Sequence, residues 1–432
     1  MTDLLAARSQ MAMSLAFHII FACIGIGMPL LMVISESLWL KTQNKVYLSL
    51  AKKWAKGTAI MFAVGAVSGT VLSFELGLLW PEFMLHAGPI IGMPFSLEGF
   101  AFFLEAIFLG IYLYGWDRVS SKMHLFSGIM VMLSGMFSGI FVVMANAWMN
   151  SPAGFEWVNG QFVNIDPFTA MLNPSALPYA LHMTLAAFVS VAFVVAGIHA
   201  FVLLRKPKSE FHYCALRIAL SVAIVTSILQ PISGDISAKN TAKQQPAKLA
   251  AMEAQWETEK GAPLRIGGWP DVENEQTLYA IEIPYLLSFL SFGTFDAEVK
   301  GLKEFPKEDR PPVAVVHFAF QIMVGCGSFM MLLGMIGAYF FLRKQPINNK
   351  VWYLRLLVFA APMGFIATEA GWTVTEVGRQ PWIIYNIMRT SDAVTTMPNL
   401  VVPFIVFTIL YIFLFVMVLY LMRLYVLNSY ED

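Results

Sequence analysis

Long runs of apolar residues alternate with short polar connections along the whole chain. A transmembrane helix needs about 20 consecutive, predominantly apolar residues to cross the hydrocarbon core of a bilayer. Runs that meet this requirement predict nine spans, at about residues 11–40, 57–80, 94–116, 124–149, 178–204, 215–235, 312–342, 352–377 and 399–427. The pattern therefore predicts an all-α protein, a polytopic membrane bundle of about nine transmembrane helices.

One polar connection is far longer than the others and divides the chain. It covers residues 236–311, between the sixth and seventh predicted spans. We therefore expect three parts: spans one to six within residues 1–235, a long loop over residues 236–311, and spans seven to nine within residues 312–432. No internal repeat or inverted symmetry is visible in the sequence, which disfavours the common secondary-transporter architectures.

Lys and Arg residues are distributed unevenly between the two sides of the predicted membrane. Sixteen lie after spans one, three, five and seven and near the C-terminus, whereas the short segments on the other side hold three: Arg8, Arg379 and Arg389. The positive-inside rule then places the C-terminus in the cytoplasm and the N-terminus outside. The long loop carries the remaining nine and lies outside, because loops of this length translocate largely regardless of charge.

The composition agrees with a membrane protein and excludes one class of partner. Hydrophobic residues make up 58% and charged residues only 13% of the 432 residues, whereas soluble domains carry roughly a quarter charged residues. Lys+Arg and Asp+Glu both number 28. Because there is no net basic field to attract phosphates, the chain is not expected to bind nucleic acid.

Several ionisable side chains fall inside the apolar spans, where they are costly and usually mark a functional site. They are His18, Glu36, Glu75, Glu98, Glu105, His182, His199, His317, Glu369 and Glu376. With a rise of about 1.5 Å per residue, four candidate iron ligands fall at similar depth near the outer face: His18, His182, Met323 and Glu376. A His–Met pair makes a low-spin haem site, and a single protein ligand leaves an iron position open for oxygen. Histidine and methionine in a span are also common as core residues, and we interpret His199 and His317 in that way.

Acidic residues recur at helical spacing in two of the spans. Glu98 and Glu105 are seven residues apart, nearly two helical turns, so both project from one face of the third span. This pair could pass protons, or could consist of protonated, hydrogen-bonded packing groups. Glu369, Trp372 and Glu376 form a similar stripe on the eighth span. The aromatic side chain there could belong to the core, or could shield a redox centre.

A short string at the end of the eighth span is the most distinctive motif in the chain. It reads Gly378-Arg379-Gln380-Pro381-Trp382, and Glu369-Ala370-Gly371-Trp372 and Glu376 precede it. Supporting strings are Arg8 with His18, Glu98-Gly99, Phe102-Phe103-Leu104-Glu105, Gly115-Trp116-Asp117-Arg118, Ala145-Asn146-Ala147-Trp148-Met149 and Lys248-Leu249-Ala250-Ala251-Met252-Glu253. Together these strings resemble subunit I of the cytochrome bd quinol oxidases, from the first span through the eighth.

The resemblance implies three haems near the outer face: two haems b, one low-spin and one high-spin, and one haem d. His182 and Met323 match the axial ligands of the low-spin haem. His18 and Glu376 match the ligands of the high-spin haem b and of haem d, and the sequence leaves open which residue binds which haem. It also leaves open whether haem b replaces haem d.

The resemblance implies roles for residues around the haems as well. Arg8 and Arg379 match cations that pair with haem propionates, since the arginine fork binds carboxylates bidentately. Trp372 matches an aromatic residue that lies between the haems. Glu98 and Glu105 match carboxylates that deliver protons to the high-spin haem region.

By the same resemblance, the long loop holds the quinol-oxidising site, with Lys248 and Glu253 as its residues. The implied activity is a quinol:O2 oxidoreductase that oxidises membrane quinol at the outer face and reduces O2 to water with protons from the cytoplasm. Such an enzyme conserves energy without pumping. The expected location is the cytoplasmic (inner) membrane of a prokaryote, and the expected partners are subunit II and a very small single-span subunit.

Three departures from the better-known members are visible. Gln321 stands beside Met323 where those members carry Arg, which would lower the potential of the low-spin haem or loosen its quinol site. Ala106 follows Glu105 where many members have Ser, which removes one hydroxyl from the implied proton path. The loop over residues 236–311 lacks the insertion that longer relatives carry in this segment.

Two alternatives remain open at this point. A relative could keep the low-spin haem b and the quinol site without reducing O2, although the presence of His18 and Glu376 disfavours it. A proton-coupled transporter, from another functional class, could use the buried acidic stripe, but it gives no reason for Met323 opposite His182.

Overall fold

The computed structural model describes residues 1–427 and is 74% helical. Within that part of the chain, nine helical segments are long and apolar enough to cross a membrane, which confirms the predicted all-α bundle. The first six are α1 Asp3–Thr42, α2 Lys45–Leu79, α3 Pro81–Tyr114, α4 Ser121–Asn150, α6 Ala176–Arg205 and α7 Glu210–Gln244. The last three are formed by α10 Val313–Leu342, by α11 Val351–Ala360 with α12 Met363–Val377, and by α14 Val401–Met422 with η4 Arg423–Leu427.

Most of these helices extend past the apolar runs that predicted them. α2 begins at Lys45, where the Asn44 side chain accepts a hydrogen bond from the Val46 N–H, as an N-cap residue does. α7 continues to Gln244, so the first residues of the predicted loop are helical. The eighth span is divided at Pro362, because proline has no N–H to continue the helical hydrogen bonds. Residues 428–432, at the end of the predicted third part, lie outside the described residues.

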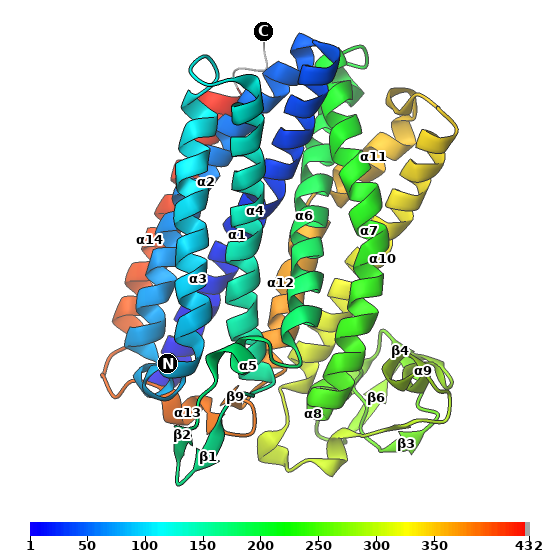
Figure 1. Ribbon diagram of the computed structural model, residues 1–432. Coiled ribbons are helices and arrows are strands. Elements are labelled where there is room, and N and C mark those ends of the chain that lie inside the picture. Colours follow the sequence, from blue (N-terminus) through cyan, green and yellow to red (C-terminus); the bar gives the residue numbers. More distant parts are fainter. Residues whose placement is uncertain (428–432) are drawn as a thin grey trace.

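The long helices run side by side in one bundle, with the start of α1 and the long loop at the same end (Figure 1). α6 lies in the interior, where two thirds of its apolar window is buried. Glycines allow close helix contacts there, as is common in membrane bundles. A Cβ added at Gly27 of α1 would lie 2.6 Å from the Val191 side chain of α6, and one added at Gly197 would lie 2.8 Å from the Leu357 carbonyl oxygen of α11.

Short strands occur only in the connections of the described chain, and the sequence pattern did not predict them. The connection after α4 holds β1 Glu156–Val158, β2 Gln161–Val163 and α5 Pro167–Met171. The connection after α12 holds β9 Trp382–Ile384, β10 Met388–Arg389 and α13 Thr390–Ala393. Each strand has two or three residues, too few to show the alternation that identifies a strand.

The long loop is a folded cap built from nested antiparallel pairs. It begins with α8 Pro246–Met252 and continues through β3 Glu259–Lys260, β4 Leu264–Ile266, β5 Trp269–Asp271, β6 Gln276–Leu278, β7 Ile281–Ile283, α9 Leu286–Phe292, β8 Glu298–Val299, η1 Leu302–Glu304 and η2 Lys307–Asp309. β5 pairs with β6, β4 with β7 and β3 with β8. This nesting brings both ends of the loop back to the bundle.

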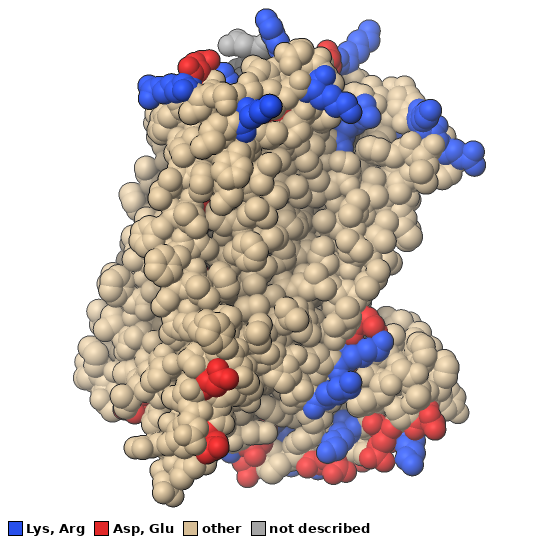
Figure 2. Space-filling model, viewed as in Figure 1, with Lys and Arg blue, Asp and Glu red and all other residues tan. Residues whose placement is uncertain are grey.

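Charged side chains collect at the two ends of the bundle and leave its middle apolar (Figure 2). The end opposite the long loop is rich in Lys and Arg, whereas the loop end shows both signs. The η3 turn, Ile347–Asn349, belongs to the former end. This is the charge asymmetry on which the expected orientation rests.

Candidate functional site

A cavity of about 670 Å³ lies between the helices α6, α7, α10 and α12 and the long loop. Five of the predicted site residues line it: His182, Met323, Trp372, Lys248 and Glu253. They come from three spans and from the loop, so the fold brings together residues that are far apart in the sequence. The cavity is therefore the centre of the candidate site.

His182 on α6 and Met323 on α10 are placed in this cavity by neighbouring small residues. The Nδ1 atom of His182 lies 3.0 Å from the Ser233 Oγ atom on α7. A Cβ added at Gly234 would lie 3.4 Å from the His182 ring, and one added at Gly371 would lie 3.0 Å from the Met323 sulfur. An imidazole and a thioether on different helices beside a large cavity are the donor set of a low-spin haem, so these residues fit that group.

Trp372 connects the cavity to the first helix. It lines the cavity and also packs against the buried cluster that includes Ile19 and Cys23 of α1. His18 precedes this cluster on α1, and its Nδ1 atom lies 2.9 Å from the Ser68 Oγ atom of α2. Trp372 thus occupies the interval between the cavity and the helix that carries His18.

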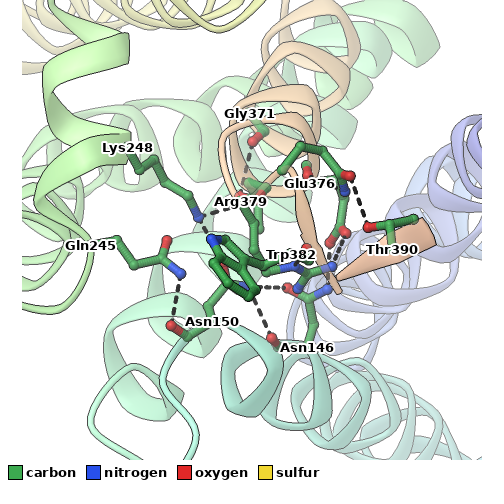
Figure 3. Close-up of polar contacts among 11 residues, drawn as sticks. Asn146, Asn150, Gln245, Lys248, Gly371, Glu376, Arg379, Trp382 and Thr390 are labelled. Carbon is green, nitrogen blue, oxygen red and sulfur yellow. Dashed lines mark hydrogen bonds and ion pairs between the residues drawn. The ribbon is translucent and has the colours of Figure 1, made fainter. Parts of the chain in front are cut away.

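Glu376 does not line the cavity but belongs to a polar network beside it (Figure 3). Asn146 of α4 donates a hydrogen bond to Glu376 Oε1 at 2.5 Å, and Arg379 donates to Glu376 Oε2 at 2.6 Å. Arg379 is only 2% exposed, and its Nη1 atom has no hydrogen-bond partner among residues 1–427. A buried guanidinium with free donors suits a second anionic group, as a haem propionate would provide.

Lys248 of α8 joins the cavity to the same network (Figure 3). Its Nζ atom donates to Asn150 Oδ1 at 2.6 Å and to the Thr375 carbonyl oxygen at 3.1 Å. Asn150 in turn donates to Asn146 Oδ1 at 3.2 Å. Burial lowers the pKa of Lys248 well below its usual value, and repulsion from Arg379 lowers the pKa further.

Glu253 follows α8 directly and is 3% exposed. Its Oε2 atom has no hydrogen-bond partner within the described part of the chain. Burial raises the pKa of Glu253 to about 8, while the Arg265 charge opposes that rise. A buried acceptor without a partner at a cavity wall suits a ligand that brings a polar hydrogen.

The two acidic residues of the third span lie in a different region, between α3 and α4. Ser138 of α4 donates to Glu98 Oε1 at 3.4 Å, and a Cβ added at Gly135 of α4 would lie 3.1 Å from Glu105 Oε1. Both carboxyls therefore lie beside α4, and Glu105 also lies near α1, where a Cβ added at Gly25 would be 3.8 Å from Glu105 Oε1. Arg8, half-buried near the start of α1, forms no ion pair within residues 1–427.

Four of the remaining ionisable groups of the spans have hydrogen-bond partners, whereas Glu369 Oε1 is buried without a hydrogen-bond partner within residues 1–427. Glu36 lies 2.8 Å from His124 Nδ1, and Glu75 accepts a hydrogen bond from Gln10 at 3.0 Å. His199 and His317 are buried and hydrogen-bonded, which agrees with the interpretation of both as core residues.

Sequence reasoning missed three residues that the structure places at the site. Asn146 and Asn150 are one turn apart at the end of α4, and the available signal was their spacing together with the place of Asn146 in the Ala145-Asn146-Ala147-Trp148-Met149 string, to which no role had been assigned. Arg265 lines the cavity, but in the sequence it is one of nine basic residues of the loop. No local pattern distinguishes it from the other eight.

Comparisons with known proteins show the family to which the chain belongs. The family described as cytochrome bd terminal oxidase subunit I matches residues 6–429. Subunit 1 of a cytochrome bd ubiquinol oxidase from Bacillus subtilis (strain 168) is 33% identical over 423 residues, covering 95% of this chain and 89% of the relative. Subunit 1 of the cytochrome bd-II ubiquinol oxidase from Escherichia coli (strain K12) is 29% identical over 456 residues, covering 90% and 88%.

A solved structure shows the same fold over nearly the full length. The bd oxidase structure from Geobacillus thermodenitrificans superimposes with a TM-score of 0.91 at 40% identity, covering 98% of both chains. The nine apolar helices of residues 1–427 and these relatives identify a multi-pass membrane protein with an oxidoreductase role in respiration, and the family implies haem iron as its cofactor. The chain belongs to the family of cytochrome bd terminal oxidase subunit I, which normally works with a second subunit.

Proposed function

We propose that this chain carries the haems and the quinol site of a bd-type terminal oxidase, which oxidises membrane quinol at the outer face and reduces O2 to water. The observation that carries the proposal is the single cavity shared by His182, Met323, Lys248 and Glu253. The predicted residues for binding quinol and for accepting its electrons thus lie at one site. The Bacillus subtilis relative named as a ubiquinol oxidase supports the substrate class, quinol.

His182 and Met323 would hold the low-spin haem b, and His18 and Glu376 would hold the high-spin haem b and haem d. The same ligands would serve if haem b replaced haem d. Arg379 would pair with a propionate through its free Nη1 atom, and Arg8 would serve as a second cation. Bound haem supplies one-electron transfer and, where an iron position is open, oxygen binding.

Glu253 and Lys248 would bind the quinol head and take up its protons. Quinol becomes quinone by losing two electrons and two protons, so a site for this reaction needs bases as well as an electron acceptor. The pKa of Glu253, raised to about 8, makes its carboxylate an effective base near neutral pH. Lys248, whose pKa is lowered by burial, can also accept a proton.

Glu98 and Glu105 would carry protons from the cytoplasm toward the haems. Both lie beside α4, and Ser138 supplies a hydroxyl beside Glu98. Ala106 supplies none beside Glu105. Moving a proton across the field is worth up to ~2.3 kcal/mol per 100 mV, so uptake from inside and release outside conserve energy without pumping. This requires the expected orientation, with the N-terminus and the long loop outside.

The proposed setting is the cytoplasmic membrane of a prokaryote, in complex with subunit II and a very small single-span subunit. α14 is the least enclosed of the described spans, with 11% of its apolar window buried. Lipid or partner subunits can cover such a face. The family assignment favours this oxidase over a transporter, and the presence of His18 and Glu376 favours it over a relative that does not reduce O2.

The test is a reduced-minus-oxidised optical spectrum of the purified complex, with pyridine haemochrome quantitation and quinol-driven O2 uptake. A far-red chlorin band, about two haems b and O2 uptake are the expected results. Haem b alone with O2 uptake would indicate replacement of haem d. Haem b without O2 uptake would indicate the non-oxygen relative, and the absence of haem would contradict the proposal.

A further inference from the structure

Two side chains of α10, His317 and Gln321, reach across to the long loop at four points. His317 Nδ1 lies 2.8 Å from the Met252 carbonyl oxygen, and Nε2 lies 3.1 Å from the Gly267 carbonyl oxygen. Gln321 donates to the Arg265 carbonyl oxygen at 3.0 Å and accepts from the Gly267 N–H at 3.1 Å. The two residues are one helical turn apart, so they lie on the same face of α10.

These contacts hold two separate walls of the cavity. Met252 immediately precedes Glu253, and both line the cavity on the α8 side. Arg265 lines it on the β4 side. His317 is fully buried and does not itself line the cavity. Its contacts with the two carbonyl oxygens therefore act on the cavity through the backbone that they position.

Other side chains hold the Arg265 guanidinium while Gln321 holds its backbone. The Arg265 guanidinium forms an ion pair with Glu282 at 2.9 Å and donates a hydrogen bond to Gln255. The Arg265 side chain is 13% exposed. A cation fixed at both its backbone and its side chain has a defined position near Glu253, whose pKa its charge lowers.

We propose that His317 and Gln321 are positioning residues for quinol oxidation, which fix the separation between Glu253 and Arg265 and so set the fit of the quinol head. This inference rests on the proposed function of the cavity. Both residues also belong to the helix that carries Met323, so the two walls are aligned with the proposed haem ligand. An electron donor bound between them would be held at a constant distance from that ligand.

Gln321 has a property that an arginine at this position would lack. Its amide group both donates to Arg265 and accepts from Gly267, whereas a guanidinium can only donate. The cation of the cavity wall is then supplied by Arg265 from the loop. Gln321 thus lacks the positive charge that an arginine would place on α10, but it makes two hydrogen bonds to the segment that carries Arg265.

The test compares His317→Ala, Gln321→Ala and the double variant in the intact purified oxidase. Each single variant loses its side-chain contacts with the loop backbone, so KM for a decyl-tailed quinol should rise roughly 3- to 30-fold, with kcat changed much less. The haem spectrum should stay unchanged. Because both residues hold Gly267, their effects should not be additive in the double variant.

A physical readout separates positioning from a general loss of stability. Amide exchange of the peptide that covers residues 264–268 should accelerate in Gln321→Ala, because the Gly267 N–H loses its acceptor. Gln321→Glu keeps that acceptor but loses the donor to Arg265, so it should slow exchange relative to Gln321→Ala while KM stays raised. Gln321→Glu also tests the inference if His317→Ala or Gln321→Ala does not assemble into the oxidase.

His124→Ala is the matched control, since His124 is another buried histidine whose two ring nitrogens contact oxygen atoms, of Glu36 and of the Tyr112 carbonyl group. It should leave KM for quinol unchanged. Unchanged KM and unchanged exchange in all the α10 variants would overturn the inference. If Glu253→Gln also left quinol oxidation unchanged, both the positioning role and the proposed location of the quinol site would be contradicted. If Glu253→Gln impaired quinol oxidation while the α10 variants did not, only the positioning role would be contradicted.

Discussion

The cavity under the long loop and the acidic region between α3 and α4 are built in different ways. The cavity joins α6, α7, α10 and α12 to the loop, and it contains buried polar atoms without partners, such as Glu253 Oε2. The acidic region joins two consecutive helices, where Glu98 accepts a hydrogen bond from Ser138. The first region has the shape and free polar groups of a ligand site, whereas the second is a packed helix contact that contains two carboxyl groups. If the two regions have the proposed functions, electron input and proton supply should be separable by mutation.

The largest expected effect is the loss of one haem from the cavity. His182→Ala removes an axial ligand, so the low-spin haem should be absent while the fold and the other haems remain. Haem quantitation and the low-temperature spectrum measure this. His86→Ala, at a half-buried histidine near the start of α3, should keep the full haem content. Full haem content in His182→Ala would show that the ligand is misassigned.

The next effect concerns proton supply. Glu105→Gln removes an ionisable group at the α4 contact, so O2 consumption at saturating quinol should fall by about two orders of magnitude, as loss of a proton-transfer residue does. KM for quinol should not change, because Glu105 does not line the cavity. Glu82→Gln, at an exposed position of α3, provides the control. A raised KM with unchanged kcat would contradict the separation of the two regions.

Glu253→Ala tests the cavity and should affect quinol oxidation rather than proton supply. Quinol turnover should fall about tenfold or more, with no change in haem content. The control is Glu257→Gln, whose exposed side chain pairs with Lys303 on the loop surface. Unchanged quinol kinetics in Glu253→Ala would contradict the role of the long loop in quinol oxidation.

A smaller effect is expected in the pH dependence. Burial raises the pKa of Glu253 to about 8, so kcat/KM for quinol should increase as the pH rises through 8 and the carboxyl becomes a base. The folded state favours the protonated form, so this group's contribution to stability is complete below its unfolded pKa and is lost as the pH approaches 8. Glu253→Gln should flatten both profiles. An unchanged activity profile in this variant would assign the titration to another group.

The smallest effect is expected from one added methyl group. A Cβ at Gly371 would lie 3.0 Å from the Met323 sulfur, so Gly371→Ala should displace that flexible side chain and shift the low-spin haem spectrum without loss of haem. Gly327→Ala is matched, because Gly327 also lines the cavity but has open space around the added Cβ. Equal spectra for both variants would place Met323 away from the haem.

Much of the fold could be predicted from the sequence because the bilayer fixes the length and apolarity of each span. The helix ends were less predictable. α7 continues to Gln244 through polar residues that lie beyond the apolar run, and hydropathy does not detect them. The break at Pro362 inside the eighth span was missed, since the apolar run continues through it.

The site residues were predictable to a different extent. Ionisable residues in apolar spans are rare, so His182, Glu105 and Glu376 could be identified as candidates from their residue type and their position in those spans. Arg265 was not, because its role depends on how the nested strands return the loop to α10. Contacts between segments distant in sequence, as between Gln321 and Gly267, leave no periodic pattern.

The central claim is that quinol delivers electrons at the cavity that contains Glu253, beside the low-spin haem. The most direct measurement is the anaerobic stopped-flow rate at which a decyl-tailed quinol reduces that haem in the parent protein and in Glu253→Gln. The account predicts a rate at least about tenfold slower in the variant, with equal and complete reduction of both proteins by dithionite. Equal rates with quinol would contradict it and place quinol oxidation elsewhere in the complex.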